Sequence, residues 1–213
     1  GSLYRFGEIQ KNQEIADLLE NIAEQGVDYF YKGKVAKQIV DLINDRGGCF
    51  DVSDMESYEP KFREPVKTTY RGYEVAAFAL PSGGCALVEM LNILENYDVR
   101  SMGHNTAASI HALTESMKLG FADRSVALGD PDFVNVDVER LTSKKFAHER
   151  FTLAGEKAGE FASADGIEAK QYPGNTSHFV VMDKDGNAFS QTQTIRDWFG
   201  CGIVVDGLGF VLN

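Results

Sequence analysis

Before residue 157, hydrophobic positions recur mainly at the three- and four-residue spacing that is typical of amphipathic helices. Gly26 and Gly47 stand where two of these patterns end, and glycine often terminates a helix. Ser53, in the segment DVSDMESY, is a candidate N-cap. The pattern therefore predicts a helix start near this serine and helices over residues 8–25, 35–46, 84–97, 105–128 and 143–156.

Two other parts of the chain are predicted to form strands. Residues 67–80 alternate hydrophobic and polar side chains around Arg71-Gly72, a plausible hairpin turn. After a small, polar stretch over residues 157–174, three predicted strands follow with the sequences SHFVVMD, AFSQTQTI and GCGIVVD. The stretch DKDGN between the first two is typical of a hairpin turn, and its glycine comes too early for a calcium loop. Helices followed by a strand meander indicate an α+β fold rather than a regular βαβ repeat.

Composition narrows the classes of function. With 213 residues, 43% of them hydrophobic, the chain has enough apolar side chains for a substantial core. Acidic residues outnumber basic ones by 32 to 21, and this net charge of -11 argues against a nucleic-acid or anionic-membrane partner. No apolar run is long enough to span a membrane, and no signal peptide is visible. The three cysteines are scattered, and neither CxxC nor HExxH occurs, so we expect no disulfide framework and no metal site.

Each of two further motifs allows either a structural or a functional interpretation. The PSGG stretch before residue 85 lacks the lysine of a phosphate-binding loop, which favours a tight turn into a helix. His111, Glu115 and Lys118 are spaced by four and three residues, so they share one helix face. They form either a salt-bridged helix surface or a charged strip of an active site.

The strand that begins near Thr176 raises a question of chemistry. A threonine hydroxyl is a weak nucleophile unless a base activates it, and no adjacent triad is evident. If the chain is cut between Asn175 and Thr176, the new α-amine can serve as that base. Its ordinary pKa, about 7.7–8.0, lies close to working pH, as general-base catalysis requires.

An ordered series of segments then resembles the γ-glutamyltransferase family of N-terminal nucleophile hydrolases over nearly the whole chain. The segments include PSGGCALVEMLNILE, ESMKLGFADRSVALGDPDFV, NTSHFVVMDKDGNAFSQTQTI and FGCGIVVDGLGFVLN. The resemblance implies part of an αββα fold and a precursor that cleaves itself between Asn175 and Thr176. Residues 1–175 would then end the large, mostly helical subunit, and residues 176–213 would begin the small subunit with strands of the catalytic sheet.

The same resemblance assigns roles to individual residues. Thr176 occupies the position of the family's nucleophile, and Thr194 that of the threonine that hydrogen-bonds the nucleophile. Ser177 departs mildly from the Thr-Thr-His run that is usual there. Arg196 stands where many relatives have an asparagine that touches the substituents of the substrate's α-carbon, which makes it a candidate substrate-binding residue.

The implied activity is γ-glutamyl transfer or hydrolysis from glutathione-like amides through a threonine ester, without metal or organic cofactor. The partners would be a γ-glutamyl donor, an amino-acid, peptide or water acceptor, and the two subunits of one precursor. The family suggests a periplasmic or extracellular location. Relatives extend beyond both ends of the match, so we expect the piece alone to be inactive. The alternatives are a cephalosporin-acylase-like or poly-γ-glutamate-cleaving member, and a non-catalytic relative that stays uncleaved.

Overall fold

The computed structural model describes residues 4–163 and 176–213, which fall into two compact units. The first unit combines residues 1–60 with residues 173–213, and the second comprises residues 61–172. The first unit therefore contains residues from both sides of the expected cleavage point. The assignment of residues 1–175 and 176–213 to two subunits stays a prediction.

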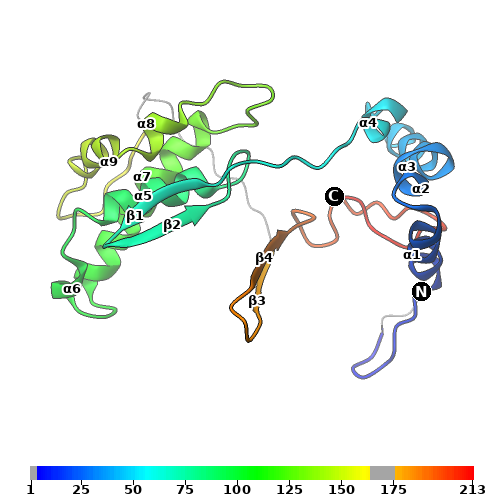
Figure 1. Ribbon diagram of the computed structural model, residues 1–213, viewed down its shortest axis with the longest axis horizontal. Coiled ribbons are helices and arrows are strands. Elements are labelled where there is room, and N and C mark those ends of the chain that lie inside the picture. Colours follow the sequence, from blue (N-terminus) through cyan, green and yellow to red (C-terminus); the bar gives the residue numbers. More distant parts are fainter. Residues whose placement is uncertain (1–3, 164–175) are drawn as a thin grey trace. The chain divides into compact units, whose positions relative to one another are not determined.

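Four helices open the first unit (Figure 1): α1 (Gln13–Gln25), α2 (Asp28–Tyr31), α3 (Gly33–Asp45) and α4 (Val52–Glu56). Helix α1 begins at Gln13 rather than at Glu8, because Asn12 caps it by accepting a hydrogen bond from the Ile15 amide at 3.2 Å. The cap of α4 is Asp51, so the assignment of Ser53 was wrong. The Asp51 carboxylate accepts a hydrogen bond from the Ser53 amide at 2.8 Å, and the backbone amide of Asp51 donates one to the Asp54 carboxylate. The two residues form a capping box.

The core of this unit joins α1 and α3 to a loop near the C-terminus. Its buried residues are Leu18, Val35, Ala36, Ile39, Val40, Met55, Val205 and Leu208. The loop is also held by polar groups: Asn12 donates to the Gly209 carbonyl at 2.6 Å and Gln38 to the Asp206 carbonyl at 2.5 Å. Residues from distant parts of the sequence thus form one core.

The third strand expected in GCGIVVD was wrong. Residues 200–206 lie in a loop that is closed by a single bridge between Val204 and Val211. Gly200 and Gly202 have φ angles of 54° and 75°, which an extended strand does not accommodate. The loop instead turns Val205 into the core, where its side chain is fully buried.

The second unit contains a hairpin of two strands, β1 (Val66–Tyr70) and β2 (Tyr73–Ala77) (Figure 1). Four helices accompany it: α5 (Gly84–Leu94), α7 (Ala107–Ala127), α8 (Val138–Thr142) and α9 (Lys144–Phe151). The short helix α6 (Val99–Met102) precedes α7. Helix α5 is central, since it contacts α7, α8, α9 and both strands. Asn92 on α5 is buried and bridges two neighbours, accepting from Thr68 and donating to the Thr142 carbonyl, each at 2.8 Å.

The hairpin turn at Arg71-Gly72 is confirmed, and so is a turn from PSGG into α5. The expected helix over residues 143–156 is shorter, because α9 ends at Phe151. Helices in the first part of the chain and the antiparallel hairpin of β3 (Ser177–Met182) and β4 (Ala188–Gln193) near its end confirm the α+β class.

Candidate active site

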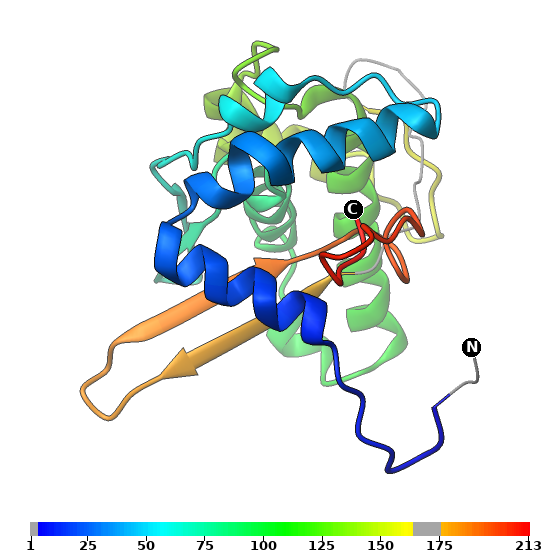
Figure 2. The same cartoon turned by 90° about the vertical axis from the view of Figure 1, so that its right-hand side faces the viewer.

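Figure 2 shows the β3–β4 hairpin, and the residues that the sequence singled out lie just beyond the ends of its two strands. Its strands pair antiparallel from Ser177 opposite Gln193 to Met182 opposite Ala188. The connecting turn is closed by Asp183, whose carboxylate accepts from the amides of Asp185 and Asn187, each at 2.9 Å. The side chain of Asn187 also donates to Asp183, and these hydrogen bonds lower the pKa of the Asp183 carboxyl. The stretch is therefore a hairpin turn, as predicted.

Thr176 and Thr194 flank the open end of this hairpin. Thr176 precedes β3 and is exposed, and Thr194 follows β4. Because Ser177 pairs with Gln193, one further step along the same register brings Thr176 opposite Thr194. Side chains at directly opposite positions of an antiparallel pair lie on the same face, at a Cβ separation of about 4.5–5.5 Å. A register continued by one step beyond the last pair therefore favours one face for the two hydroxyls, and the roles assigned to them stay predictions.

The chain turns sharply directly after Thr194. The Thr194 hydroxyl oxygen accepts a hydrogen bond from the Arg196 amide at 2.7 Å, which closes a local turn. Arg196 has a φ of 72°, a left-handed conformation that is uncommon for a residue with a side chain. The Asp197 carboxylate then accepts from the Trp198 amide at 2.7 Å. The candidate substrate-binding arginine therefore sits, exposed, on a turn that the candidate partner of the nucleophile holds in place.

His178 shares the face of Thr176, since side chains alternate along a strand. Its Nδ1 is hydrogen-bonded to the hydroxyl of Thr192 at 2.7 Å, and its Nε2 to the hydroxyl of Ser190 at 3.2 Å. The imidazole is thus fixed across the hairpin, two residues from the candidate nucleophile. His178, Ser190 and Thr192 were not among the predicted site residues. Strand alternation alone would have placed His178 on the face of Thr176.

The opposite face of the hairpin has a different character. Ser177 lies on that face with Phe179, whose ring stands 5.8 Å from the ring of Phe189. The hydroxyl of Ser177 is therefore directed away from Thr176, which makes this serine a matched control for the nucleophile. Asn175, the residue on the other side of the expected cleavage point, lies outside the described residues.

The charged face of α7 has a structural partner. His111 and Glu115 hydrogen-bond to the backbone at Gly155 and Gly159, and Lys118 pairs with Glu115 at 2.9 Å. Of the two interpretations of this face, an ion-paired one fits better than an open catalytic strip. Its partner is a segment of the same unit rather than solvent.

A buried charge cluster joins α5, α7 and α9. Glu89, Asp123 and Arg150 are at most 6% exposed, and Arg150 Nε lies 2.7 Å from Asp123 Oδ2. Burial, together with the hydrogen bond to Asp123 and its negative charge, raises the pKa of Glu89 to about 9. Glu89 is therefore protonated at neutral pH. A shifted carboxyl often marks an active site, but this one is closed off by the three helices, so we assign it to helix packing.

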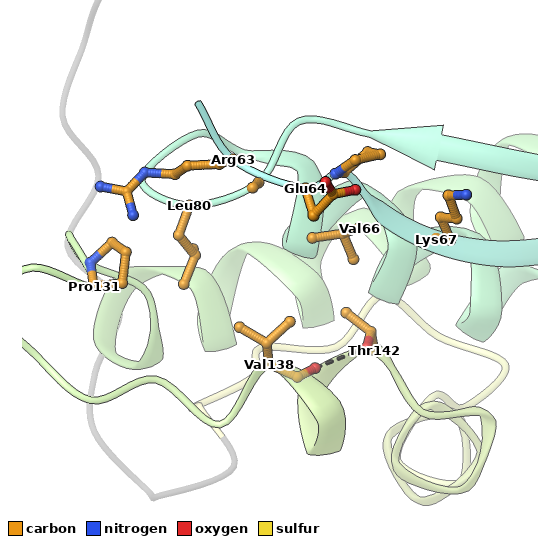
Figure 3. A pocket seen from close by; sticks show the side chains of 10 residues that line it. Arg63, Glu64, Val66, Lys67, Leu80, Pro131, Val138 and Thr142 are labelled. Atoms are coloured by element: carbon orange, nitrogen blue, oxygen red, sulfur yellow. Dashed lines mark hydrogen bonds between the residues drawn. The ribbon is translucent and has the colours of Figure 1, made fainter. Parts of the chain in front are cut away.

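A pocket of about 510 Å³ opens beside the β1–β2 hairpin (Figure 3). Arg63, Leu80, Pro131, Val138 and Thr142 are among its lining residues. The guanidinium of Arg63 is already paired, at 3.0 Å from Asp132 and 3.6 Å from Asp130. The pocket contains neither of the candidate threonines, so it is not the predicted site.

Within residues 4–163 and 176–213, no group of three or more histidine, cysteine, aspartate or glutamate side chains is arranged to hold a metal ion. A helix able to cross the bilayer is likewise not found over these residues.

Comparison with known proteins gives a consistent assignment. Residues 1–213, the whole chain, match the family described as Gamma-glutamyltranspeptidase. The chain is 36% identical over 215 residues to a glutathione hydrolase proenzyme of Pseudomonas sp. (strain A14), covering 100% of the chain and 37% of that protein. It is 38% identical over 201 residues to an acylase ACY 1 proenzyme of Pseudomonas sp. (strain SE83), covering 94% of the chain and 36% of that protein.

A solved structure supports the same conclusion about the fold. The cephalosporin acylase from Bacillus halodurans superposes with a TM-score of 0.83 and 31% identity, over 98% of this chain and 37% of that one. The fold is therefore part of the αββα architecture of N-terminal nucleophile hydrolases. Within that class, the chain belongs to the γ-glutamyltranspeptidase family, and it spans 37% of the glutathione hydrolase proenzyme that it matches.

Proposed function

We propose that the full-length protein cleaves itself between Asn175 and Thr176 and then transfers or hydrolyses γ-glutamyl groups of glutathione-like amides. The observation that supports this proposal is the register of the β3–β4 hairpin in a chain of this family, because its last pair, Ser177–Gln193, leaves Thr176 and Thr194 as the next residues at the open end. The glutathione hydrolase name of a relative supports the substrate class.

The self-cleavage step needs only the residues at the junction and a water molecule. The Thr176 hydroxyl oxygen attacks the carbonyl carbon of Asn175, its proton passes to the departing nitrogen, and the peptide C–N bond breaks. Asn175 is then held as an ester on Thr176, and water hydrolyses this ester. The products are a carboxylate on Asn175 and a free α-amine on Thr176. Before this step the nitrogen of Thr176 is an amide and cannot act as a base.

The freed amine then serves the proposed turnover reaction. It accepts the proton of its own hydroxyl while the oxygen attacks the γ-glutamyl carbonyl. The amide bond of the donor breaks, its amine leaves with the proton, and a γ-glutamyl ester of Thr176 remains. Water or the amine of an acceptor then attacks this ester, which gives hydrolysis or transfer in a ping-pong sequence. We assign Thr194 to hold the Thr176 hydroxyl in position, and His178 to the same polar face.

The proposed partners follow from this scheme. They are the γ-glutamyl donor, its acceptor and the two subunits of one precursor. Because the chain spans only 37% of its glutathione hydrolase relative, we expect residues outside it to complete the substrate site. The isolated piece is therefore expected to be inactive. We also propose a location in the periplasm or outside the cell, which family resemblance supports.

Mass spectrometry and N-terminal sequencing of the full-length gene product test the cleavage. We expect the wild type to split into two chains, the smaller beginning at Thr176, and Thr176→Ser to split more slowly. Thr176→Ala should stay whole. Ser177→Ala, which removes the hydroxyl on the opposite face, should split like the wild type. If the folded wild type stays whole, the protein is an uncleaved, non-catalytic relative and the proposal is wrong.

An acylase-type donor is the second candidate, because an acylase ACY 1 proenzyme is 38% identical to the chain and Arg196 is exposed beside Thr194. A glutaryl donor has the carboxylate of a γ-glutamyl donor but lacks its α-ammonium group, which a nearby arginine would repel. The kcat/KM values of the cleaved enzyme for γ-glutamyl and glutaryl anilides separate the two candidates. A preference for glutaryl that Arg196→Asn shifts toward γ-glutamyl would favour the acylase.

A further inference from the structure

Three large apolar side chains are exposed on the turn that follows Thr194. We call residues 195–200 the aromatic turn. Trp198 is 79% exposed, Phe199 is 75% exposed and Ile195 is 44% exposed. Exposed apolar groups that gather in one place often mark a binding surface, whereas scattered single ones are ordinary. The aromatic turn belongs to the first unit, as both candidate threonines do.

The backbone of the aromatic turn has an uncommon conformation. Arg196 and Phe199 have φ angles of 72° and 60°, in the left-handed region that residues with a side chain rarely occupy. Such residues persist only where the surrounding structure holds them, and they cluster at functional sites. Hydrogen bonds hold this turn. The Gly200 amide donates to the Asp197 carbonyl at 3.0 Å, and the Gly202 amide donates to the carbonyl of Phe199 at 2.8 Å.

The end of the aromatic turn is anchored in the core of the first unit. A Cβ atom on Gly200 would stand 1.9 Å from the carbonyl oxygen of Leu212, so the two backbones are in close contact. The amide of the next residue, Cys201, donates to the same carbonyl at 3.1 Å, and Leu212 packs against the buried core. Rings that served only this core would be buried beside Leu212. Trp198 and Phe199 instead stay exposed on a turn whose base is fixed.

The aromatic turn is also close to the candidate site. Trp198 comes four residues after Thr194, and a fully extended chain covers at most about 14 Å over that length. Two hydrogen bonds shorten this distance further. The Arg196 amide donates to the Thr194 hydroxyl at 2.7 Å, and the Asp197 amide donates to the carbonyl of Ile195 at 3.0 Å. A substrate that reacts at the open end of the hairpin can therefore contact the aromatic turn.

The proposed acyl group offers these rings little to bind. Between its reacting carbonyl and its carboxylate, a γ-glutamyl or glutaryl group has only a short run of saturated carbons. Its carboxylate suits the guanidinium of Arg196. The amine part of the substrate is the part that can carry a large apolar group. Aromatic rings bind such a group through a large apolar contact area and through stacking.

We propose that Trp198 and Phe199 form an apolar wall that contacts the amine part of the substrate, so that the protein prefers amides of aromatic amines to amides of small, polar amines. The inference rests on the proposed function and names the substrate class of that same site. The wall serves the leaving amine of the donor and the incoming amine of an acceptor, because both stand at the same place relative to the acyl ester. The bonds that form and break are those of the proposed acyl transfer.

Substitutions in the full-length, cleaved protein test the wall. For each variant, kcat/KM is measured for a naphthylamide and a glycine amide of the acyl group that the wild type cleaves faster. The ratio of the two values reports the preference for the amine, because the intrinsic reactivity of each amide is the same for every variant. Trp198→Ala should lower this ratio about tenfold, and Phe199→Ala should lower it as well. Trp198→Phe, which keeps an aromatic ring, should stay within about threefold of the wild type.

The control and a second readout do not depend on the amine preference itself. Tyr73→Ala removes a ring of the second unit that is 77% exposed, and it should leave the ratio unchanged. Because Trp198 is the one tryptophan of this chain, the difference between the wild type and Trp198→Phe isolates its fluorescence. Acrylamide should quench this emission in the cleaved protein, and benzylamine, added as a probe of the amine site, should protect it.

The outcomes distinguish this inference from the proposed function. A wild type that neither cleaves itself nor turns over either acyl group overturns the proposed function, and the wall with it. An active wild type whose ratio is the same in Trp198→Ala and Phe199→Ala overturns the wall alone. An equal fall in kcat/KM for both amides would also overturn it, because the turn would then support the site without selecting the amine. Emission from Trp198 that acrylamide fails to quench would show that another part of the protein covers the ring, and the wall would again be wrong.

Discussion

Thr176 and Thr194 are the residues next to the last pair of the β3–β4 hairpin, Ser177–Gln193, and so stand at its open end. The hydroxyl of Thr194 is oriented in part by the Arg196 amide, which donates to it at 2.7 Å. A group that holds a nucleophile in one orientation acts on rate more than on stability.

We therefore expect Thr194→Ala to slow self-cleavage of the full-length precursor about tenfold, the loss that one hydrogen bond of roughly 1.4 kcal/mol implies. Thr194→Ser keeps the hydroxyl and should remain within about twofold of the wild type. The time course of precursor loss on denaturing gels measures both. Equal rates for the alanine and serine variants would exclude a role for the Thr194 hydroxyl.

A second prediction concerns the buried pair of Glu89 and Asp123. Because the pKa of Glu89 is about 9 in the folded protein against 4.5 for the free group, the folded state keeps a proton that the unfolded state releases. The stability that depends on this proton is complete below about pH 4.5 and is lost as the pH rises toward 9.

Glu89→Gln mimics the protonated acid at every pH. The variant should therefore become more stable than the wild type above about pH 5, and the difference in unfolding free energy should grow by about 1.4 kcal/mol per pH unit. Denaturant unfolding of the uncleavable precursor at several pH values measures this. Asp123→Asn, which leaves Arg150 buried without its counter-charge, should instead destabilise by about 3 kcal/mol. A constant difference between Glu89→Gln and wild type would contradict the assignment.

The sequence predicted one turn that local chemistry decides and missed a loop that distant contacts decide. The turn at Arg71-Gly72 was correct because it depends on the residues within it. The strand expected over residues 200–206 was wrong because Val205 is drawn into a core made with α1 and α3, which its own neighbours do not reveal.

For the candidate site, too, the sequence indicated some residues and could not indicate others. Thr176, Thr194 and Arg196 could be named from family resemblance, and the hairpin register leaves the two threonines next to its last pair, Ser177–Gln193. Their roles stay predictions. The grip of Glu115 on the Gly159 amide could not be predicted, because it joins positions 44 residues apart and helix periodicity gives only the shared face. The cleavage itself stays a prediction.

The entry into α5 offers a test of backbone packing. A Cβ atom on Gly84 would stand 1.8 Å from the carbonyl oxygen of Phe78, whereas one on Gly83 would meet no atom within 4 Å. Gly84→Ala should therefore destabilise the second unit by about 3 kcal/mol, because backbone rather than a movable side chain must yield. Gly83→Ala is the control and should change the thermal midpoint little. Similar midpoints for the two variants would show that the chain relaxes around the added methyl group.

The last prediction concerns the core that residues from both sides of the cleavage point share. Leu208 lies in this core with α1 and α3, while Val204, in the same loop, is 53% exposed. Leu208→Ala should cost about 2–5 kcal/mol, as buried leucines do. Val204→Ala should cost much less.

The consequence of the Leu208 change depends on whether the chain is cut. In the uncleavable Thr176→Ala precursor, the peptide link keeps the loop near α1 and α3, so the loss appears only as a lower thermal midpoint. After cleavage the same loss weakens the contact between two separate chains, so dissociation should become dependent on concentration. Size-exclusion chromatography of serially diluted samples of both forms measures this. If cleaved Leu208→Ala and cleaved Val204→Ala stay equally associated on dilution, the shared core does not hold the subunits together.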